Sequence, residues 1–266
     1  MITHFARLQL NTVSLQGVKQ FYHDLLRFPI IYESNNEIRF LPTESFTLAF
    51  KEAAEPIAPA HFAFEVPYSE FENVVKWIDK ERISLLKWTD GRIVDVFETG
   101  KNVYFRDGDG NLLEIITHNY VKEGILPPCG PLKILYLRET GFPVDSVIQF
   151  RELLVRILNL KLDKVSDNFT FAIGGTAHAV IPSKTRKWIP IAMSALPPTM
   201  NVSFGVTNSI FIEEVKTCLQ EEDIIYESNG DDELYFKIHE YSFGLCMTNF
   251  PEEVPSLLNL PLSRLK

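Results

Sequence analysis

A strand-helix-hairpin pattern that recurs four times constrains the fold of this 266-residue chain most strongly. Each repeat opens with a short run of alternating apolar and polar residues, continues with apolar residues at helical spacing, and ends in two or three further β-like runs. The opening runs lie at residues 7–11, 61–66, 134–138 and 201–206, and the helical patterns lie at residues 18–26, 71–78, 147–157 and 211–219. The sequence therefore predicts an α+β protein that is built from four βαβββ units.

A proline-rich stretch, residues 125–131 (ILPPCGP), separates the second unit from the third. Proline cannot continue a helix or a central strand, so we interpret this stretch as a linker. We therefore expect two tandem domains, at residues 1–124 and 132–250. The tail, residues 251–266, has no strand period and is expected either to form a short helix or to stay loose.

Charge and composition argue against several classes of binding partner. A net charge of −9 argues against nucleic acid, whose phosphates require clustered Lys and Arg. No apolar run approaches the roughly 18 residues that a membrane span needs, and the N-terminus lacks the segments of a secretory signal. The 3 widely spaced cysteines predict neither a disulfide framework nor a zinc knuckle. We expect a cytoplasmic protein whose partner is a small molecule, with no nucleic-acid or membrane partner.

Polar side chains recur on one face of the predicted strands. Alternate residues of a strand share a face, so Arg7, Gln9 and Asn11 lie together on the first strand. His61 and Glu114 occupy the polar faces of two later strands. A curved sheet with helices on one face and a cleft on the other would produce this pattern, and so would a sheet with a solvated outer face.

Three segments of the first half carry a family resemblance. Residues 104–114 (YFRDGDGNLLE) look like a terminal hairpin in which an Asp-x-Asp-Gly-Asn turn precedes a strand with a glutamate. Residues 61–66 (HFAFEV) and residues 14–22 (SLQGVKQFY) are similar to the fifth strand and the first helix of the same family. This family is the vicinal oxygen chelate superfamily of glyoxalases, bleomycin-resistance proteins and extradiol dioxygenases. The resemblance implies two tandem domains of the glyoxalase/bleomycin-resistance/dioxygenase type.

The resemblance also implies a metal site. Metal-dependent members use a His or Gln on the first strand, a His on the fifth and a Glu on the eighth, and His61 and Glu114 match the last two positions. The resemblance thus implies that both are metal ligands, that Glu114 is also catalytic, and that the divalent metal is Fe, Mn, Ni or Zn. The first position falls on Arg7, which stays protonated and cannot bind a metal. His4 could replace it only if a β-bulge re-aimed its side chain.

Arg7 leaves two interpretations open. It could form a bidentate ion pair with Glu114, or it could bind an anionic ligand in the cleft. In either case Gln9 and Asn11 are expected as further ligand contacts. Two functions follow. One is a metal-dependent lyase, isomerase or extradiol-type dioxygenase that acts on vicinal substrate oxygens. The other is a metal-free protein of the bleomycin-resistance type that binds or sequesters a small molecule.

The second half departs further from the family pattern. Asn201 and Leu245 occupy the positions that match His61 and Glu114, and the leading strand at residues 134–140 has no histidine. We therefore expect no metal in the second domain, which would buttress the first domain or mediate a homodimer. His178 is interpreted as a structural histidine.

Overall fold

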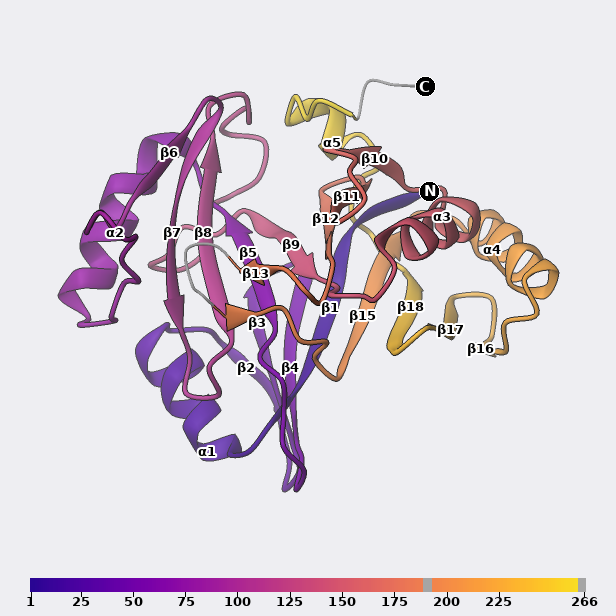
Figure 1. The fold of residues 1–266 in the computed structure, drawn as a ribbon, viewed down its shortest axis with the longest axis horizontal. Helices are drawn as coiled ribbons and strands as arrows, with labels where there is room; N and C mark the ends of the chain where they lie inside the picture. The colour runs from indigo at the N-terminus through magenta and orange to yellow at the C-terminus, as the bar shows by residue number, and fades with distance from the viewer. Residues whose placement is uncertain (189–192, 263–266) are drawn as a thin grey trace.

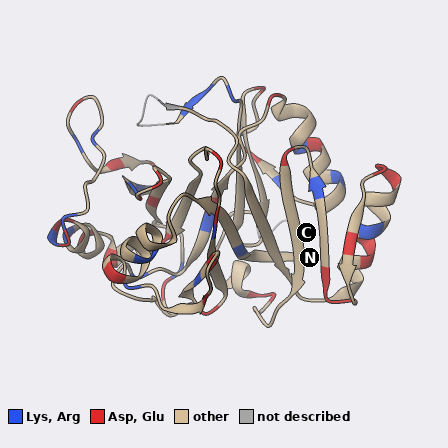
Figure 2. Ribbon diagram, turned by 90° about the horizontal axis from the view of Figure 1, so that it is seen from below, with Lys and Arg blue, Asp and Glu red and all other residues tan. Residues whose placement is uncertain are grey.

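The structure, a computed structural model, describes residues 1–188 and 193–262. The chain forms the four predicted βαβββ units, arranged as two eight-stranded sheets with helices outside them (Figure 1). Among the described residues, no helix combines the length and the hydrophobicity that crossing a membrane would require. Figure 2 shows acidic and basic residues side by side on the helices and hairpins.

The elements follow the order of the units. The first unit comprises β1 (Ile2–Thr12), α1 (Leu15–Val18), its π-helical continuation η1 (Lys19–Leu25), β2 (Ile30–Glu33), β3 (Glu37–Thr43) and β4 (Phe46–Glu52). The second comprises β5 (His61–Glu65), η2 (Tyr68–Glu70), α2 (Phe71–Lys80), β6 (Asp95–Phe97), β7 (Gly100–Arg106) and β8 (Leu112–His118). The third comprises β9 (Tyr136–Gly141), α3 (Val147–Leu158), β10 (Lys161–Asp163), β11 (Phe169–Gly174) and β12 (Ala177–Pro182). After β13 (Lys187–Trp188) and β14 (Met193–Ser194), the fourth comprises β15 (Met200–Val206), α4 (Ser209–Glu221), β16 (Tyr226–Asn229), β17 (Glu233–Ile238) and β18 (Tyr241–Met247), and α5 (Val254–Leu257) follows it.

Each sheet combines one unit from each half of the chain. Sheet 1 joins the first and fourth units in the order β16-β17-β18-β15-β1-β4-β3-β2, and sheet 2 joins the second and third units in the order β10-β11-β12-β9-β5-β8-β7-β6. The junctions are antiparallel, between β1 and β15 and between β5 and β9. Strand pairing therefore crosses the predicted linker at residues 125–131, and the domain boundary there stays a prediction.

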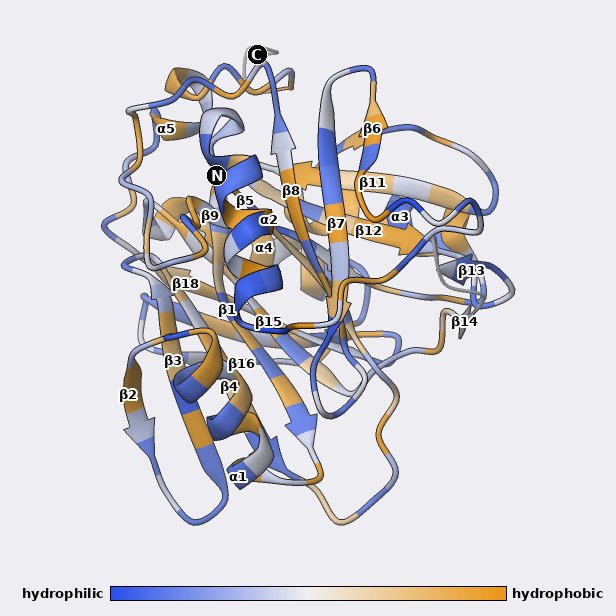
Figure 3. Ribbon diagram, turned by 90° about the vertical axis from the view of Figure 1, so that its left-hand side faces the viewer, coloured by the Kyte–Doolittle hydropathy of each residue, from blue (hydrophilic) through white to orange (hydrophobic). Residues whose placement is uncertain are grey.

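Local sequence explains where the helices begin and end. Ser14, Ser146 and Asn208 each accept a hydrogen bond from a backbone N–H in the first turn of α1, α3 and α4, respectively. α3 ends at Asn159, whose φ of 51° lies in the left-handed region that asparagine tolerates. Figure 3 shows hydrophilic and hydrophobic residues alternating around α2, which buries its apolar side against sheet 2.

Aromatic side chains join the two sheets into one core. Phe64 of β5 is fully buried, and its ring centroid lies 6.0 Å from that of Phe28 and 6.0 Å from that of Phe46. Phe28 and Phe46 belong to the first unit, so this contact ties sheet 1 to sheet 2. A hydrogen bond also joins the first and second units, because Tyr22 of η1 donates to Asp107 in the predicted Asp-Gly turn at 2.7 Å. The core therefore holds the two sheets in a defined relation.

Candidate metal centre

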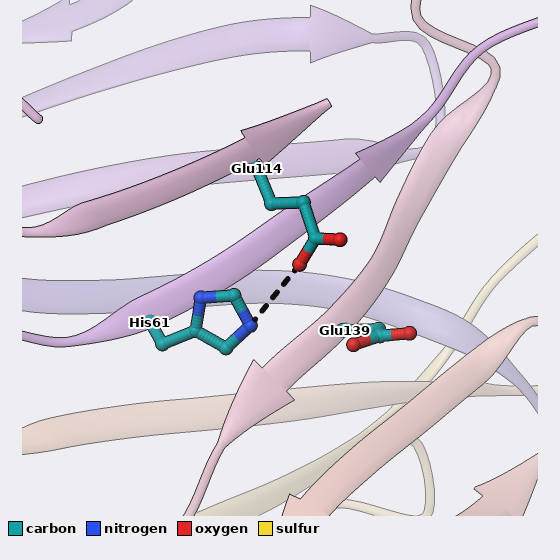
Figure 4. A group of neighbouring side chains, drawn as sticks. All are labelled: His61, Glu114 and Glu139. Carbon is teal, nitrogen blue, oxygen red and sulfur yellow. Dashed lines mark ion pairs between the residues drawn. The ribbon is translucent and has the colours of Figure 1, made fainter. Parts of the chain in front are cut away.

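His61 opens β5, and its ring points toward the carboxylate of Glu114 (Figure 4). Its Nδ1–H donates to the carbonyl oxygen of Leu112 at 3.2 Å, and its Nε2 lies 3.5 Å from Oε2 of Glu114. Burial lowers the pKa of His61 to about 4, so the imidazole is neutral at neutral pH. The Nε2 lone pair therefore faces the carboxylate, as a metal ligand requires.

Glu114 lies on β8, beside β5. It is buried, and its Oε1 accepts a hydrogen bond of 2.7 Å from Nδ2 of Asn102 on β7. Burial raises the pKa of Glu114 well above its usual value, and the charge of Glu139 raises it further. Asn102 thus orients Glu114, while the surroundings disfavour its negative charge.

Glu139 of β9 is the third member of the cluster. Ala63 of β5 pairs with Glu114 on one side and with Glu139 on the other, so both glutamates project from the same face of sheet 2. The pairing of β5 with β9 shifts register between Ala63 and Phe64, which leaves Arg138 as an extra residue in β9. This bulge turns both Arg138 and Glu139 toward the cleft.

The three side chains form a compact group that could hold a metal ion. One ligand atom each from His61, Glu114 and Glu139 lies within 4.8 Å of the others, and all three residues are buried. Two buried carboxylates at this separation repel each other unless a cation lies between them. A neutral imidazole with two carboxylates is a donor set that suits Fe, Mn, Ni or Zn. The residues present therefore fit a divalent metal.

Arg138 compensates these carboxylates only in part, because its main partner is Glu65. Its Nη1 donates to Glu65 at 3.1 Å, whereas its Nε lies 3.5 Å from Oε1 of Glu139. Glu65 is completely buried and also accepts a hydrogen bond of 2.9 Å from the backbone N–H of His118. The negative charge of Glu114 and Glu139 together therefore exceeds the positive charge that Arg138 brings to them.

The ring of Trp188 packs close to Gly141 and covers the cluster on one side. The ring centroids of His61 and Trp188 lie 5.0 Å apart. A Cβ added at Gly141 would lie 2.8 Å from the Trp188 ring and 3.3 Å from Cβ of His61. Glycine at this position therefore lets the indole pack over the histidine.

The cluster lies in a cleft of about 700 Å³, which is large enough for a small molecule. Two cations lie on aromatic rings in one wall of the cleft. The guanidinium of Arg186 lies 4.3 Å from the ring centroid of Phe169, and Nζ of Lys164 lies 5.3 Å from that of Phe171. An organic ligand would thus meet aromatic surface and positive charge as well as the acidic cluster.

The structure separates the predicted ligand-binding residues from the cluster. Arg7, Gln9 and Asn11 lie on β1 in sheet 1, whereas His61 and Glu114 lie in sheet 2. Nη2 of Arg7 bonds to Glu37 and to Gln9, at 2.9 Å each. The suggested ion pair between Arg7 and Glu114 is therefore wrong, because β1 pairs with β15 and β4 rather than with the strands of sheet 2. Arg7 and Gln9 instead line a separate cleft.

His4 is also in sheet 1. β1 is irregular on both sides of it, with register shifts at Ile2/His4 and Phe5/Arg7. These irregularities do not bring the imidazole to His61, Glu114 and Glu139. Its Nε2 lies 3.1 Å from the carbonyl oxygen of Ser45, and its ring stacks on Phe250 with centroids 4.3 Å apart. His4 is a packed, hydrogen-bonded residue of the core edge.

The environment of His4 predicts a loss of stability in acid. Burial lowers the pKa of His4 from 6.5 to about 4, so the unfolded chain takes up a proton at a higher pH than the folded chain. The stabilisation is complete above pH 6.5 and is lost as the pH falls toward 4, by about 3 kcal/mol at most. We expect the free energy of urea unfolding to depend less on pH in His4→Gln. A folded His4→Gln protein with the wild-type pH dependence would contradict the assignment.

Glu139 was missed from sequence, and it comes from the half of the chain in which no metal ligand was expected. That half offers no histidine on its leading strand and no match to His61 or Glu114. The adjacent charges of Arg138 and Glu139, directly after the apolar run of residues 134–137, were the available signal. The described residues contain no second group of three His, Cys, Asp or Glu side chains this close together, and Asn201 and Leu245 both lie in sheet 1.

Comparisons with known proteins agree with this fold. No protein-family model matches the chain. Metallothiol transferase FosB of Staphylococcus saprophyticus is 30% identical over 102 residues, which cover 36% of this chain and 65% of the transferase. Metallothiol transferase FosB of Staphylococcus haemolyticus is 28% identical over 103 residues, which cover 37% of this chain and 71% of the transferase. The sequence similarity thus extends over little more than a third of the chain.

Solved structures match almost the whole chain. A dioxygenase-like protein of Bacillus subtilis superposes with a TM-score of 0.68 at 12% identity, over 97% of this chain and 90% of that one. Glyoxalase I of Zea mays gives a TM-score of 0.58 at 12% identity, over 99% of this chain and 97% of the enzyme. Fold and site together define a protein of paired βαβββ units with a ligand cleft on its sheets. The chain therefore has the fold of these dioxygenase and glyoxalase structures, as its sequence motifs predicted.

Proposed function

We propose that the protein is an enzyme that binds one divalent metal ion through His61, Glu114 and Glu139 and takes a small-molecule substrate in the cleft of sheet 2. The observation that carries this proposal is the pair of buried carboxylates beside a neutral imidazole, with atoms within 4.8 Å of one another. The similarity to metallothiol transferases and the fold of glyoxalase I support a metal-dependent reaction. Fe, Mn, Ni and Zn are the candidate ions.

The surrounding residues have defined tasks in this proposal. A bound ion would act as a Lewis acid on a substrate oxygen. The carbonyl of Leu112 holds His61 in the tautomer with a free Nε2, and Asn102 orients Glu114. Trp188 packs against His61 and limits the access of water on that side. The chain thus supplies an oriented and partly shielded ligand set.

Metal analysis tests the proposal. Protein purified without chelators and loaded separately with Fe, Mn, Ni or Zn is expected to retain one ion per chain, measured by inductively coupled plasma mass spectrometry. His61→Ala and Glu139→Gln should lose it, whereas Glu98→Gln, at an exposed glutamate of the same cleft, should keep it. Failure of the folded wild-type protein to bind any of the four ions would overturn the proposal and favour metal-free sequestering of a small molecule. The homodimer and the cytoplasmic location stay predictions.

A further inference from the structure

A second cleft, of about 610 Å³, lies on sheet 1 and belongs to none of the machinery described above. Its floor comes from the junction of the first and fourth units, so it is the counterpart in sheet 1 of the cleft in sheet 2. Strand register gives the floor two rows of residues. These rows are Arg7-Ser203-Gly244-Tyr235 and Gln9-Asn201-Ser242-Lys237, each running across β1, β15, β18 and β17.

The positive charge of Arg7 on this floor is only partly neutralised by a neighbouring carboxylate. Its carboxylate partner, Glu37, also bonds to Nε of Arg39 at 2.6 Å, so one carboxylate serves two guanidinium groups. Nε of Arg7 is buried and has no hydrogen-bond partner among the described residues. A buried N–H without a partner is costly, and a ligand oxygen would satisfy it.

The rest of the cleft offers neutral hydrogen-bonding groups, apolar side chains and two further charged residues of opposite sign, Lys237 and Glu227. Asn201 and Ser203 lie beside Arg7 on the floor, and two apolar side chains of the cleft, Ile225 and Tyr235, have exposed fractions of 89% and 42%. A Cβ on Gly244 would lie 2.7 Å from Oγ of Ser203 and 3.2 Å from the Tyr235 ring, so glycine keeps the floor open here. Exposed apolar side chains around a polar, cationic floor are typical of a site for an organic ligand.

We propose that the second cleft binds a small organic carboxylate without a metal ion. Arg7 would bind the carboxylate through its free N–H groups, Asn201 and Ser203 would add hydrogen bonds, and Ile225 and Tyr235 would cover the apolar part of the ligand. The metal cluster of sheet 2 takes no part in this binding, so the proposal does not depend on the function assigned to that cluster.

The test uses the full-length protein after treatment with a chelator. Benzoate is the probe and benzamide, of nearly the same shape but uncharged, is its control. Titration followed by arginine 15Nε–1H NMR spectra is expected to shift the Nε signal of Arg7 with benzoate and to leave it in place with benzamide. Arg7→Gln should weaken benzoate binding about tenfold, whereas Arg92→Gln, at an exposed arginine that lines the cleft of sheet 2, should leave it unchanged.

A second variant keeps the test decisive if Arg7→Gln fails to fold. Asn201 is exposed, so Asn201→Asp should fold normally while placing a like charge beside the bound carboxylate. We expect it to weaken benzoate binding about tenfold as well. Equal binding of benzoate and benzamide, an unshifted Arg7 signal, or wild-type affinity in a folded Asn201→Asp protein would each overturn the proposal.

Discussion

Glu65→Ala is expected to lower the free energy of unfolding by about 3–5 kcal/mol. Glu65 is completely buried between Arg138 and His118, and its carboxylate accepts hydrogen bonds from both. Without it, the guanidinium of Arg138 would stay buried with a hydrogen bond of 2.8 Å to the neutral Tyr120 hydroxyl and only the longer contact to a carboxylate, that of Glu139. An uncompensated buried charge is among the most destabilising changes that a single substitution can make. Urea unfolding followed by circular dichroism measures the effect.

Two further variants test whether the loss of stability comes from the unpaired buried charge of Arg138 or would follow the loss of any ion pair. Glu72→Ala removes the pair with Lys101, but the Glu72 side chain is 60% exposed, so we expect a change below about 1 kcal/mol. Adding Arg138→Leu to Glu65→Ala removes the stranded charge, and the double variant should recover part of the lost stability. A double variant no more stable than Glu65→Ala alone would show that the buried guanidinium is not the cause.

Glu114→Gln is expected to make the metal-free protein more stable and, at the same time, to weaken metal binding at least about 100-fold. The amide has the size of the carboxylate and can still accept the hydrogen bond from Asn102. It removes one of two buried carboxylates that repel each other, which should stabilise the metal-free protein by about 1–2 kcal/mol at neutral pH. The loss of a direct ligand should cost at least as much affinity as the loss of an outer contact.

The gain in stability expected for Glu114→Gln should depend on pH in a direction that can be measured. Burial and then Glu139 raise the pKa of Glu114 in the folded chain, so deprotonation costs folding free energy as the pH rises above the unfolded value. The advantage of Glu114→Gln should therefore be small near pH 4 and grow toward pH 7. Urea unfolding of chelator-treated proteins at several pH values measures it, and isothermal titration measures metal affinity. A Glu114→Gln variant less stable than the wild-type protein at pH 7 would contradict the repulsion argument.

The four units could be predicted because their signals are local. Helical spacing and strand alternation repeat within about ten residues, and caps such as Ser14 and Asn208 mark where helices begin. The pairing of units could not be predicted in the same way, since β1 has the same alternation whether its neighbour is β15 or a strand of the second unit. Arg7 was therefore assigned to the cleft of His61, although it lies in the other one.

The candidate site was predicted in two of its three members. His61 and Glu114 lie on regular strands, where alternate residues share a face. Regular alternation would send Glu139 to the core beside Leu137 and leave only Arg138 in the cleft, but the bulge in β9 turns both charged residues to the same side. A bulge arises from the register between two strands, and the sequence of β9 alone does not reveal it.

The pairing of the units also sets an order in which the chain can assemble. Sheet 2 draws its strands from residues 61–182, whereas sheet 1 needs the first strand of the chain and strands that follow residue 200. During synthesis, sheet 2, with His61, Glu114 and Glu139, can therefore form while the edge of β1 that pairs with β15 is still unpaired. Such a long sequence separation slows folding and leaves β1 exposed to competing partners. The cleft at Arg7 is thus completed last, when β1 pairs with β15.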